Sequence, residues 1–322
     1  MKKNLIVLGF AALAFAGCKQ FKKGPGDLQY IIHEDESGAT VKEGDFLAIK
    51  FIQKTEEDSV LASSFDFDRP TFLVQQKAAF KGDIYDGLAL LSEGDSATFK
   101  VNLDSMAAKG MPKPANTKGK YMLFTIKLDK IIPKGKMNDS LFQTKIDGFL
   151  KAEVDKAKNQ EAGKISGYIA SKDLKPTVTA SGLQYIITKE GTGPKAAVGD
   201  TVKLDYTGMF LSGKVFDTSV QAVAQKSGTF NAQRPYEPMK VPAGLNGTIP
   251  GFDEALLLFP KGTKATVIIP SKLAYGEQGN QAIPPYMPIV FDIEVVDIIK
   301  GKPGSVQQPM QMPGMPQSGV PQ

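Results

Sequence analysis

An internal repeat is the sequence feature that most constrains the fold of this chain. Residues 28–32 and residues 183–187 both read LQYII, an offset of 155. Further matches follow at offsets of 155, 168 and 167, and they pair Gly44-Asp45 with Gly199-Asp200, Phe51 with Tyr206, Gly94 with Gly262 and Phe124 with Phe291. A nearly constant offset over such a length indicates a duplicated domain. The length of 322 residues is also sufficient for two domains, since a domain typically has roughly 100–200 residues.

The hydrophobic pattern of the second copy predicts strands and one short helix. Apolar side chains occupy every second position in 202–206 and, as Ile289, Phe291, Ile293 and Val295, in 289–296. This is the period of a strand with one buried face. Helical spacing relates four apolar residues that follow a Pro-Gly pair: Phe252, Ala255, Leu256 and Phe259. We therefore predict an α+β fold in which each copy is an antiparallel sheet with one helix packed across it.

The two copies are separated by a segment with a helical pattern. Apolar residues recur at helical spacing from Leu141 to Leu174. This spacing predicts one or two amphipathic helices over 137–175, interrupted near Gly163, in a linker that covers 137–178. The linker would be either a spacer that packs on a domain or an arm for dimerisation or client binding. Residues 303–322 are rich in Pro, Gln and Met without periodicity, which predicts a disordered tail.

The first residues have the pattern of an export signal. Two lysines precede an apolar run over 5–17, which is too short to span a membrane. Small residues at 16 and 17 precede Cys18 and resemble the lipobox of bacterial lipoproteins, in which cleavage leaves the cysteine as the acylated N-terminus. Residues 1–17 are then a signal peptide and 18–26 a lipid-anchored tether. Lys19 favours an outer-membrane address facing the periplasm. The alternative is an ordinary signal peptide followed by a free cysteine.

The residue inventory excludes several kinds of site. One Cys and one His cannot form a thiolate or imidazole metal cluster, and a disulfide within the chain is impossible. A Ser–His–Asp site could exist only around His33, which has no partner pattern and is expected at the surface. The net charge of +5 has both signs scattered along the chain, so nucleic acid is not an expected partner. We expect no metal and no cofactor.

The second copy resembles the FKBP-type peptidyl-prolyl cis–trans isomerases. The segments that carry the resemblance, in order, are SGLQY at 181–185, VKLDYTG at 202–208, GKVFDTS at 213–219, IPGF at 249–252, LAYG at 273–276, IPP at 283–285 and IVFD at 289–292. The family fold is a half-barrel of antiparallel strands wrapped round one short helix. The resemblance therefore implies two FKBP-like half-barrels, at 27–136 and 179–302, joined by the helical spacer.

The resemblance also implies the residues of a proline pocket. The implied catalytic residues are Tyr206, Phe216, Asp217, Tyr275 and Phe291, and the implied substrate-binding residues are Met239, Val241, Ile249, Phe252 and Ile283. In this scheme the Tyr275 hydroxyl and the Ile249 backbone N–H hold substrate carbonyls, and Asp217 acts electrostatically. Phe252 stands where many relatives have tryptophan. The loop from Asp217 to Met239 is longer than the family pattern, so the rim of the pocket is expected to differ.

The first copy departs from the pattern at the same positions. The repeat offset places Phe51 at the position of Tyr206, Leu61 at that of Phe216 and Ala62 at that of Asp217, and Ala107 falls near the position of Tyr275. Both hydroxyls and the carboxylate are thus lost, whereas apolar positions persist. Residues 27–136 are predicted to be a degenerate, non-catalytic copy.

The function predicted from these features is prolyl isomerisation that assists the folding of exported proteins in the bacterial cell envelope. The expected partners are unfolded or partly folded exported chains with X–Pro bonds, the membrane through the N-terminal lipid, and a second copy of the chain in a homodimer. The alternative is a non-catalytic chaperone or assembly lipoprotein that binds proline-containing segments.

Overall fold

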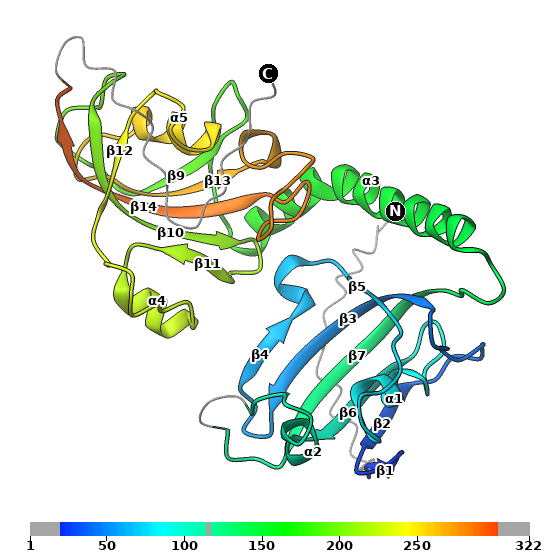
Figure 1. Ribbon diagram of the computed structural model, residues 1–322. Coiled ribbons are helices and arrows are strands. Elements are labelled where there is room, and N and C mark those ends of the chain that lie inside the picture. Colours follow the sequence, from blue (N-terminus) through cyan, green and yellow to red (C-terminus); the bar gives the residue numbers. More distant parts are fainter. Residues whose placement is uncertain (1–19, 114–116, 302–322) are drawn as a thin grey trace, which may run out of the picture. The chain divides into compact units, whose positions relative to one another are not determined.

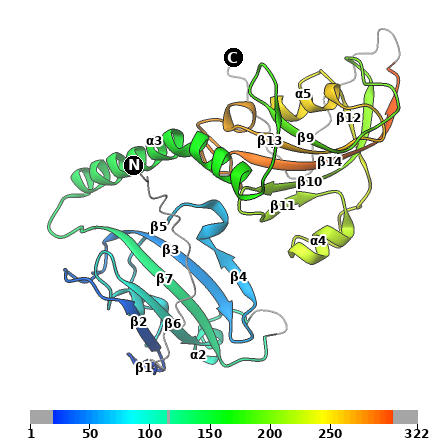
Figure 2. The same cartoon turned by 180° about the vertical axis from the view of Figure 1, so that it is seen from behind.

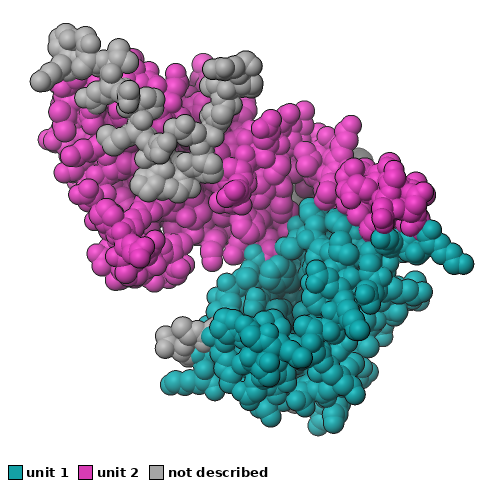
Figure 3. Space-filling view, in the orientation of Figure 1, with its two compact units in different colours: residues 1–63, 70–136 teal, residues 64–69, 137–322 magenta. Residues whose placement is uncertain are grey.

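The computed structural model describes residues 20–113 and 117–301 (Figure 1). The signal peptide, Cys18 and the tail expected over 303–322 lie outside these ranges. The chain forms two compact units (Figure 3): unit 1 is Met1–Ser63 with Pro70–Lys136, and unit 2 is Ser64–Arg69 with Met137–Gln322. In the described part of the chain, no helix combines the length and the apolar character needed to cross a membrane.

Unit 1 is built on a seven-stranded sheet in which every pairing is antiparallel. The strands run in the order β1 (Lys22–Lys23), β2 (Gln29–Glu34), β6 (Ser96–Asn102), β7 (Tyr121–Ile132), β3 (Phe46–Thr55) and β4 (Val60–Ser63), and β5 (Thr71–Val74) also pairs with β3. Two short helices complete this copy, α1 (Ile84–Leu88) and α2 (Leu103–Ala107). The carboxylate of Asp83 caps α1 by accepting a hydrogen bond from the N–H of Ile84.

Unit 2 has a sheet of the same topology, again with only antiparallel pairs. Its order is β8 (Thr177–Val178), β9 (Gln184–Lys189), β13 (Lys264–Ile269), β14 (Ile289–Ile299), β10 (Thr201–Phe210) and β11 (Val215–Thr218), and β12 (Met239–Pro242) also pairs with β10. Two helices accompany this sheet, α4 (Gln221–Ser227) and α5 (Pro250–Leu258). Figures 1 and 2 show α5 across one face of the sheet and α4 beyond β11, at its edge.

Strand register repeats between the two sheets at the offsets seen in the sequence. Phe51 pairs with Ile126 in unit 1, and Tyr206 pairs with Ile293 in unit 2. The register shift within β3, between Ala48 and Ile49, recurs in β10 between Lys203 and Leu204. A one-residue slip would turn every buried side chain to the opposite face, so an identical register keeps the same positions buried in both sheets. The predicted α+β fold of two half-barrels with one short packed helix each is confirmed.

The helix α5 covers the core of unit 2 because its apolar residues lie on one face. Pro250 opens the helix, where its fixed φ and missing N–H carry no penalty. Phe252, Ala255 and Leu256 then point to the sheet and are at most 1% exposed. The helix ends at Leu258, and Phe259, with extended backbone and 1% exposure, inserts into the same core. This packing sets the floor on which the candidate site is built.

The linker is one continuous helix, α3 (Asp139–Ser171), so the interruption expected near Gly163 is wrong. Glycine in a helix interior costs only about 1 kcal/mol relative to alanine. In addition, a Cβ built on Gly163 would have no neighbour within 4 Å, so this position carries no tertiary packing that could bend the helix. Asn138 begins the helix by accepting a hydrogen bond from the Leu141 N–H.

The C-terminal half of α3 packs on the sheet of unit 2. Ile165 and Tyr168, 5% and 8% exposed, form an apolar cluster with Ile268 and Val290. The carboxylate of Glu161 accepts hydrogen bonds from both the N–H and the hydroxyl of Ser271, at 2.5 and 2.7 Å. This half of the helix is therefore part of the second unit, in agreement with a spacer that packs on a domain.

Candidate active site

The structure brings together all ten residues expected in the pocket. Nine of them belong to a single apolar cluster, and Asp217 is hydrogen-bonded to one of the nine. The buried members are Tyr206, Val241, Phe252, Ile283 and Phe291, and the partly buried members are Phe216, Met239, Ile249 and Tyr275. They come from strands β10, β11, β12 and β14, from the start of α5 and from the segment between β13 and β14.

Four aromatic rings make edge-to-face and tilted contacts in this cluster. The centroids of Phe252 and Phe291 lie 4.9 Å apart at an interplanar angle of 67°. The ring of Phe216 meets Phe291 at 5.8 Å and 90°, and the ring of Tyr206 meets Phe252 at 6.3 Å and 81°. Such arrangements place the positive edge of one ring on the negative face of the next. The result is a packed aromatic cluster formed by side chains distant in the sequence.

A glycine that the sequence analysis did not single out allows these rings to approach. A Cβ built on Gly208 would lie 2.7 Å from the ring of Phe216 and 2.8 Å from that of Phe291. Any other residue would push these rings apart. The matching residue of the first copy is Gln53. Gly208 is the last residue of the segment VKLDYTG, which carries the family resemblance. The need for a glycine there, however, depends on two rings that come from other strands.

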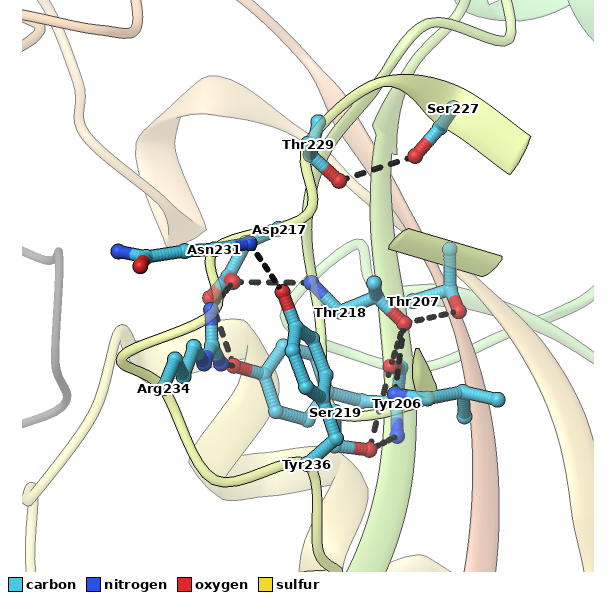
Figure 4. A network of polar contacts seen from close by, with 11 residues as sticks. Tyr206, Thr207, Asp217, Thr218, Ser219, Ser227, Thr229, Asn231, Arg234 and Tyr236 are labelled. Carbon is cyan, nitrogen blue, oxygen red and sulfur yellow. Dashed lines mark hydrogen bonds and ion pairs between the residues drawn. The ribbon is translucent and has the colours of Figure 1, made fainter. Parts of the chain in front are cut away.

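The polar part of the cluster is a three-residue network (Figure 4). The Tyr206 hydroxyl donates to Oδ2 of Asp217 at 2.6 Å. The Arg234 guanidinium pairs with Oδ1 of Asp217 and donates to the Tyr206 hydroxyl at 2.9 Å. Burial raises the pKa of Tyr206, and the charge of Asp217 raises it further. Tyr206 therefore stays a neutral phenol that orients the carboxylate.

Arg234 is a site residue that the sequence analysis missed. It lies in the loop between β11 and β12, which covers 219–238, and that loop includes the unpredicted helix α4. One signal could have identified it. The chain contains two arginines, Arg69 and Arg234, and each is followed by proline between the matching strands of the two copies. In the second copy this arginine meets a carboxylate, whereas the first copy has Ala62 in place of Asp217.

Two hydrogen-bond donors of the pocket remain available for a substrate. Within residues 20–113 and 117–301, neither the Tyr275 hydroxyl nor the Ile249 backbone N–H has a hydrogen-bond partner. Burial raises the pKa of Tyr275 to about 12, with a smaller contribution from the charge of Asp217. Tyr275 is therefore a neutral donor at physiological pH. Both groups are of the kind that holds a peptide carbonyl.

No described group of three or more His, Cys, Asp or Glu side chains could hold a metal ion. The only histidine, His33, is exposed, and its Nε2 lies 2.8 Å from the Thr98 hydroxyl. The cluster itself consists of apolar side chains, phenols and one carboxylate–guanidinium pair. Its chemistry is therefore that of an apolar cradle with a few fixed polar groups.

The first copy keeps the strand register without these polar groups. Ala62 pairs with Gln53 in the sheet of unit 1, as Asp217 pairs with Gly208 in unit 2. The half-buried ring of Phe51 replaces the phenol of Tyr206. This unit thus preserves the frame of the site, while the phenol, the carboxylate and the close ring contact are absent from it.

Comparison with known proteins points to one family. Residues 193–296 match the family model described as FKBP-type peptidyl-prolyl cis-trans isomerase. The chain is 38% identical over 205 residues to the FKBP-type peptidyl-prolyl cis-trans isomerase FkpA of Aeromonas hydrophila, which covers 58% of this chain and 71% of that protein. It is 28% identical over 239 residues to FkpA of Escherichia coli K12, covering 71% of this chain and 81% of the relative.

Two further similarities were found. The chain is 33% identical over 175 residues to the outer membrane protein MIP of Legionella longbeachae, covering 53% of this chain and 69% of that protein. Among solved structures, the crystal structure of FkpA from Escherichia coli aligns with a TM-score of 0.38 and 29% identity, over 51% of this chain and 74% of that one.

Proposed function

The chain belongs to the FKBP-type peptidyl-prolyl cis-trans isomerase family, and we propose that the pocket of residues 179–302 carries its isomerase activity. The protein is a peptidyl-prolyl cis–trans isomerase, and its substrates are proline-containing polypeptides. One observation supports the proposed site. The aromatic cluster around Phe252 and Phe291 includes Tyr206, which also belongs to the hydrogen-bonded network with Asp217 and Arg234.

The reaction needs no broken bond, and this fits the composition of the pocket. Rotation about an X–Pro bond is opposed by amide resonance, with a barrier of about 18–20 kcal/mol. At the twisted transition state the resonance is lost, and the carbonyl carries less separated charge than in either planar state. An apolar pocket with water excluded therefore disfavours the planar amide more than the twisted one, and this difference in binding lowers the barrier.

The polar groups then orient the substrate in the proposed mechanism. The Tyr275 hydroxyl donates to one substrate carbonyl and the Ile249 N–H donates to another, which fixes the peptide on both sides of the rotating bond. The Asp217 carboxylate faces the twisted amide electrostatically. Its position is fixed because Tyr206 and Arg234 both hydrogen-bond it. Phe216 and Phe291 enclose the proline ring.

A cis–trans assay on the full chain with an X–Pro peptide tests this proposal. We expect acceleration of isomerisation, and line broadening or shifts of the peptide resonances on binding. The alternative function, a chaperone that only binds proline segments, predicts binding without acceleration. That result would contradict the assignment of these residues as catalytic.

We further propose that the protein works in the cell envelope as a lipoprotein anchored through Cys18. The proposal rests on the basic and apolar residues before that cysteine, and on the membrane location named for the relative MIP. A Cys18→Ser variant should lose acyl labelling and move from the membrane fraction to the soluble fraction. A variant that stayed membrane-bound, with a parent protein that took up no acyl label, would contradict the anchor.

We also propose that residues 27–136 form a non-catalytic copy that supports binding of protein clients or dimerisation of the chain. The support is the preserved fold of unit 1 together with Phe51, Ala62 and Gln53 in place of site residues. An exported, unfolded client would then contact more than the proline pocket. The same proposal includes the domain boundaries, which place the linker at 137–178 and the isomerase domain at 179–302.

A further inference from the structure

The loop 219–238 gives the second copy a surface that the first copy lacks. It joins β11 to β12, whereas the matching strands β4 and β5 are joined by the seven residues 64–70. The extra length forms α4, which ends at Gly228 in a left-handed conformation (φ 75°). The N–H of Thr229 then bonds back to the Ala224 carbonyl at 3.0 Å. The loop is therefore folded against itself.

Two aromatic rings stack at the end of this loop. Phe230 and Tyr236 lie 5.5 Å apart with an interplanar angle of 12°. The Tyr236 hydroxyl accepts a hydrogen bond from the Asn231 N–H at 2.9 Å, which closes the turn between the two rings (Figure 4). Phe230 is nevertheless 43% exposed. A single exposed apolar residue is ordinary, but here the ring is presented on a hydrogen-bonded support.

The stack is connected to the pocket through Arg234. The guanidinium of Arg234 lies 5.7 Å from the ring centroid of Tyr236, and its nitrogens contact Asp217 and Tyr206. One residue thus joins the network of the pocket to the exposed stack. The two steps, from guanidinium to Tyr236 and from Tyr236 to Phe230, measure 5.7 and 5.5 Å. An extended chain advances about 3.3 Å per residue, so about three to four client residues span the path from the guanidinium to Phe230.

We propose that Phe230 and Tyr236 form a second substrate subsite, which takes an aromatic or bulky aliphatic side chain within about four residues of the isomerised proline. The occupant is a segment of the bound client, because Arg234 of this loop contacts Asp217 and Tyr206 of the proposed site, so the loop lies beside a proline bound there. The inference rests on the proposed function. The subsite makes Phe230 a specificity-determining residue, and it favours unfolded clients whose apolar side chains are exposed near proline.

The test compares a short peptide with a series of long peptides as substrates of the full chain. The short peptide ends one residue either side of the X–Pro bond. The long peptides carry Phe, or Ser as a reference, at successive positions up to four residues from the proline on each side. For one of these positions we expect kcat/KM to be about five- to tenfold higher with Phe than with Ser, as one well-packed aromatic contact provides. The Phe230→Ala variant should lose this ratio, and Phe230→Leu should keep much of it.

A matched control is Phe72→Ala, since Phe72 is 37% exposed and also stacks on a second ring, that of Phe46, but lies in unit 1. This variant should keep the preference for Phe. An unchanged preference in folded Phe230→Ala, or no preference at any position in the parent, would overturn the subsite while leaving the isomerase intact. No turnover of any peptide by the parent would instead overturn the proposed function, and the subsite with it.

Discussion

The Tyr206 hydroxyl donates a 2.6 Å hydrogen bond to Oδ2 of Asp217, from the strand next to that of the carboxylate. Arg234 contacts both residues, so phenol, carboxylate and guanidinium form one unit at the wall of the pocket. In the first copy the same two strand positions hold Phe51 and Ala62. The first copy therefore lacks both the phenol and the carboxylate of this wall.

The isomerase activity should not titrate with Tyr275 below about pH 10. Burial raises the pKa of Tyr275 to about 12, so its hydroxyl remains a donor where an ordinary tyrosine would ionise. The expected result is a constant kcat/KM for a short X–Pro peptide between about pH 7 and 10. The parent could instead lose activity with an apparent pKa near that of free tyrosine, while a Tyr275→Phe variant shows no such loss. That result would contradict the burial of the Tyr275 hydroxyl.

The raised pKa of Tyr275 also gives a prediction for the stability of the fold at alkaline pH. The folded-state pKa of Tyr275 lies above its unfolded value of about 10. Its contribution to the free energy of unfolding is therefore fully present below about pH 10 and is lost as the pH rises toward the folded-state value. Denaturant titrations of the parent and of Tyr275→Phe should show a steeper alkaline loss for the parent.

Asp200 should stabilise the fold in a way that acid removes. Lys300 and the backbone N–H groups of Ala197 and Gly301 hydrogen-bond this carboxylate and lower its pKa to about 2. Since the folded-state pKa is depressed, the stabilisation is present above the unfolded value of about 4 and is lost as the pH falls toward 2. Asp200→Asn should lower the Tm at neutral pH, and the difference from the parent should shrink in acid.

The exposed carboxylate of Asp58 provides the control for that measurement. Its side chain is 83% exposed in an ion pair with Lys54, and such pairs contribute little. Asp58→Asn should therefore leave the Tm nearly unchanged at both pH values. An equal effect of the two substitutions would show that the contacts of Asp200 are not the cause.

Removal of the first copy should affect protein clients more than short peptides. The deletion should cover 27–136, a span that also removes Ser64–Arg69 of unit 2, and it should keep α3, because Glu161, Ile165 and Tyr168 pack on the isomerase sheet. Peptide turnover should stay within about twofold of the parent. Catalysed refolding of a proline-limited protein should slow several-fold, since a tethered client reaches an effective concentration in about the mM range. Equal refolding rates at equal concentration would indicate that the first copy only spaces the enzyme.

Much of the fold could be predicted because it depends on local patterns. The alternation over 202–206 and the spacing of Phe252, Ala255 and Leu256 predict a strand and a helix without knowledge of their neighbours. The continuity of α3 through Gly163 could not be predicted in the same way. A glycine weakens a helix, and whether it also breaks the helix depends on the surrounding helical residues.

Residues of the candidate site could be predicted where a family motif specifies them. They could not be predicted where only the tertiary structure determines which residue is needed. All of the expected pocket residues except Met239 and Val241 lie in the ordered motifs, and the structure brings the apolar ones into one cluster. Arg234 lies in a loop whose length has no counterpart in the first copy, so no motif indicated its contact with Asp217. The requirement for Gly208 likewise depends on the rings of Phe216 and Phe291, which approach it from other strands.

The central claim is that the site of the second copy performs the isomerisation, and the first copy supplies the substitutions that test it. A full-length variant with Tyr206→Phe, Phe216→Leu and Asp217→Ala carries the residues found at Phe51, Leu61 and Ala62. The first copy adopts the same strand register with these side chains, so the variant should fold, which circular dichroism and the Tm would verify.

The decisive measurement is kcat/KM of this triple variant on an X–Pro peptide, at a concentration where the parent is clearly active. We expect a fall of at least about tenfold, because the polar wall and one enclosing ring are removed together. A folded variant with activity within about twofold of the parent would contradict the account, since the isomerisation would then take place outside this pocket.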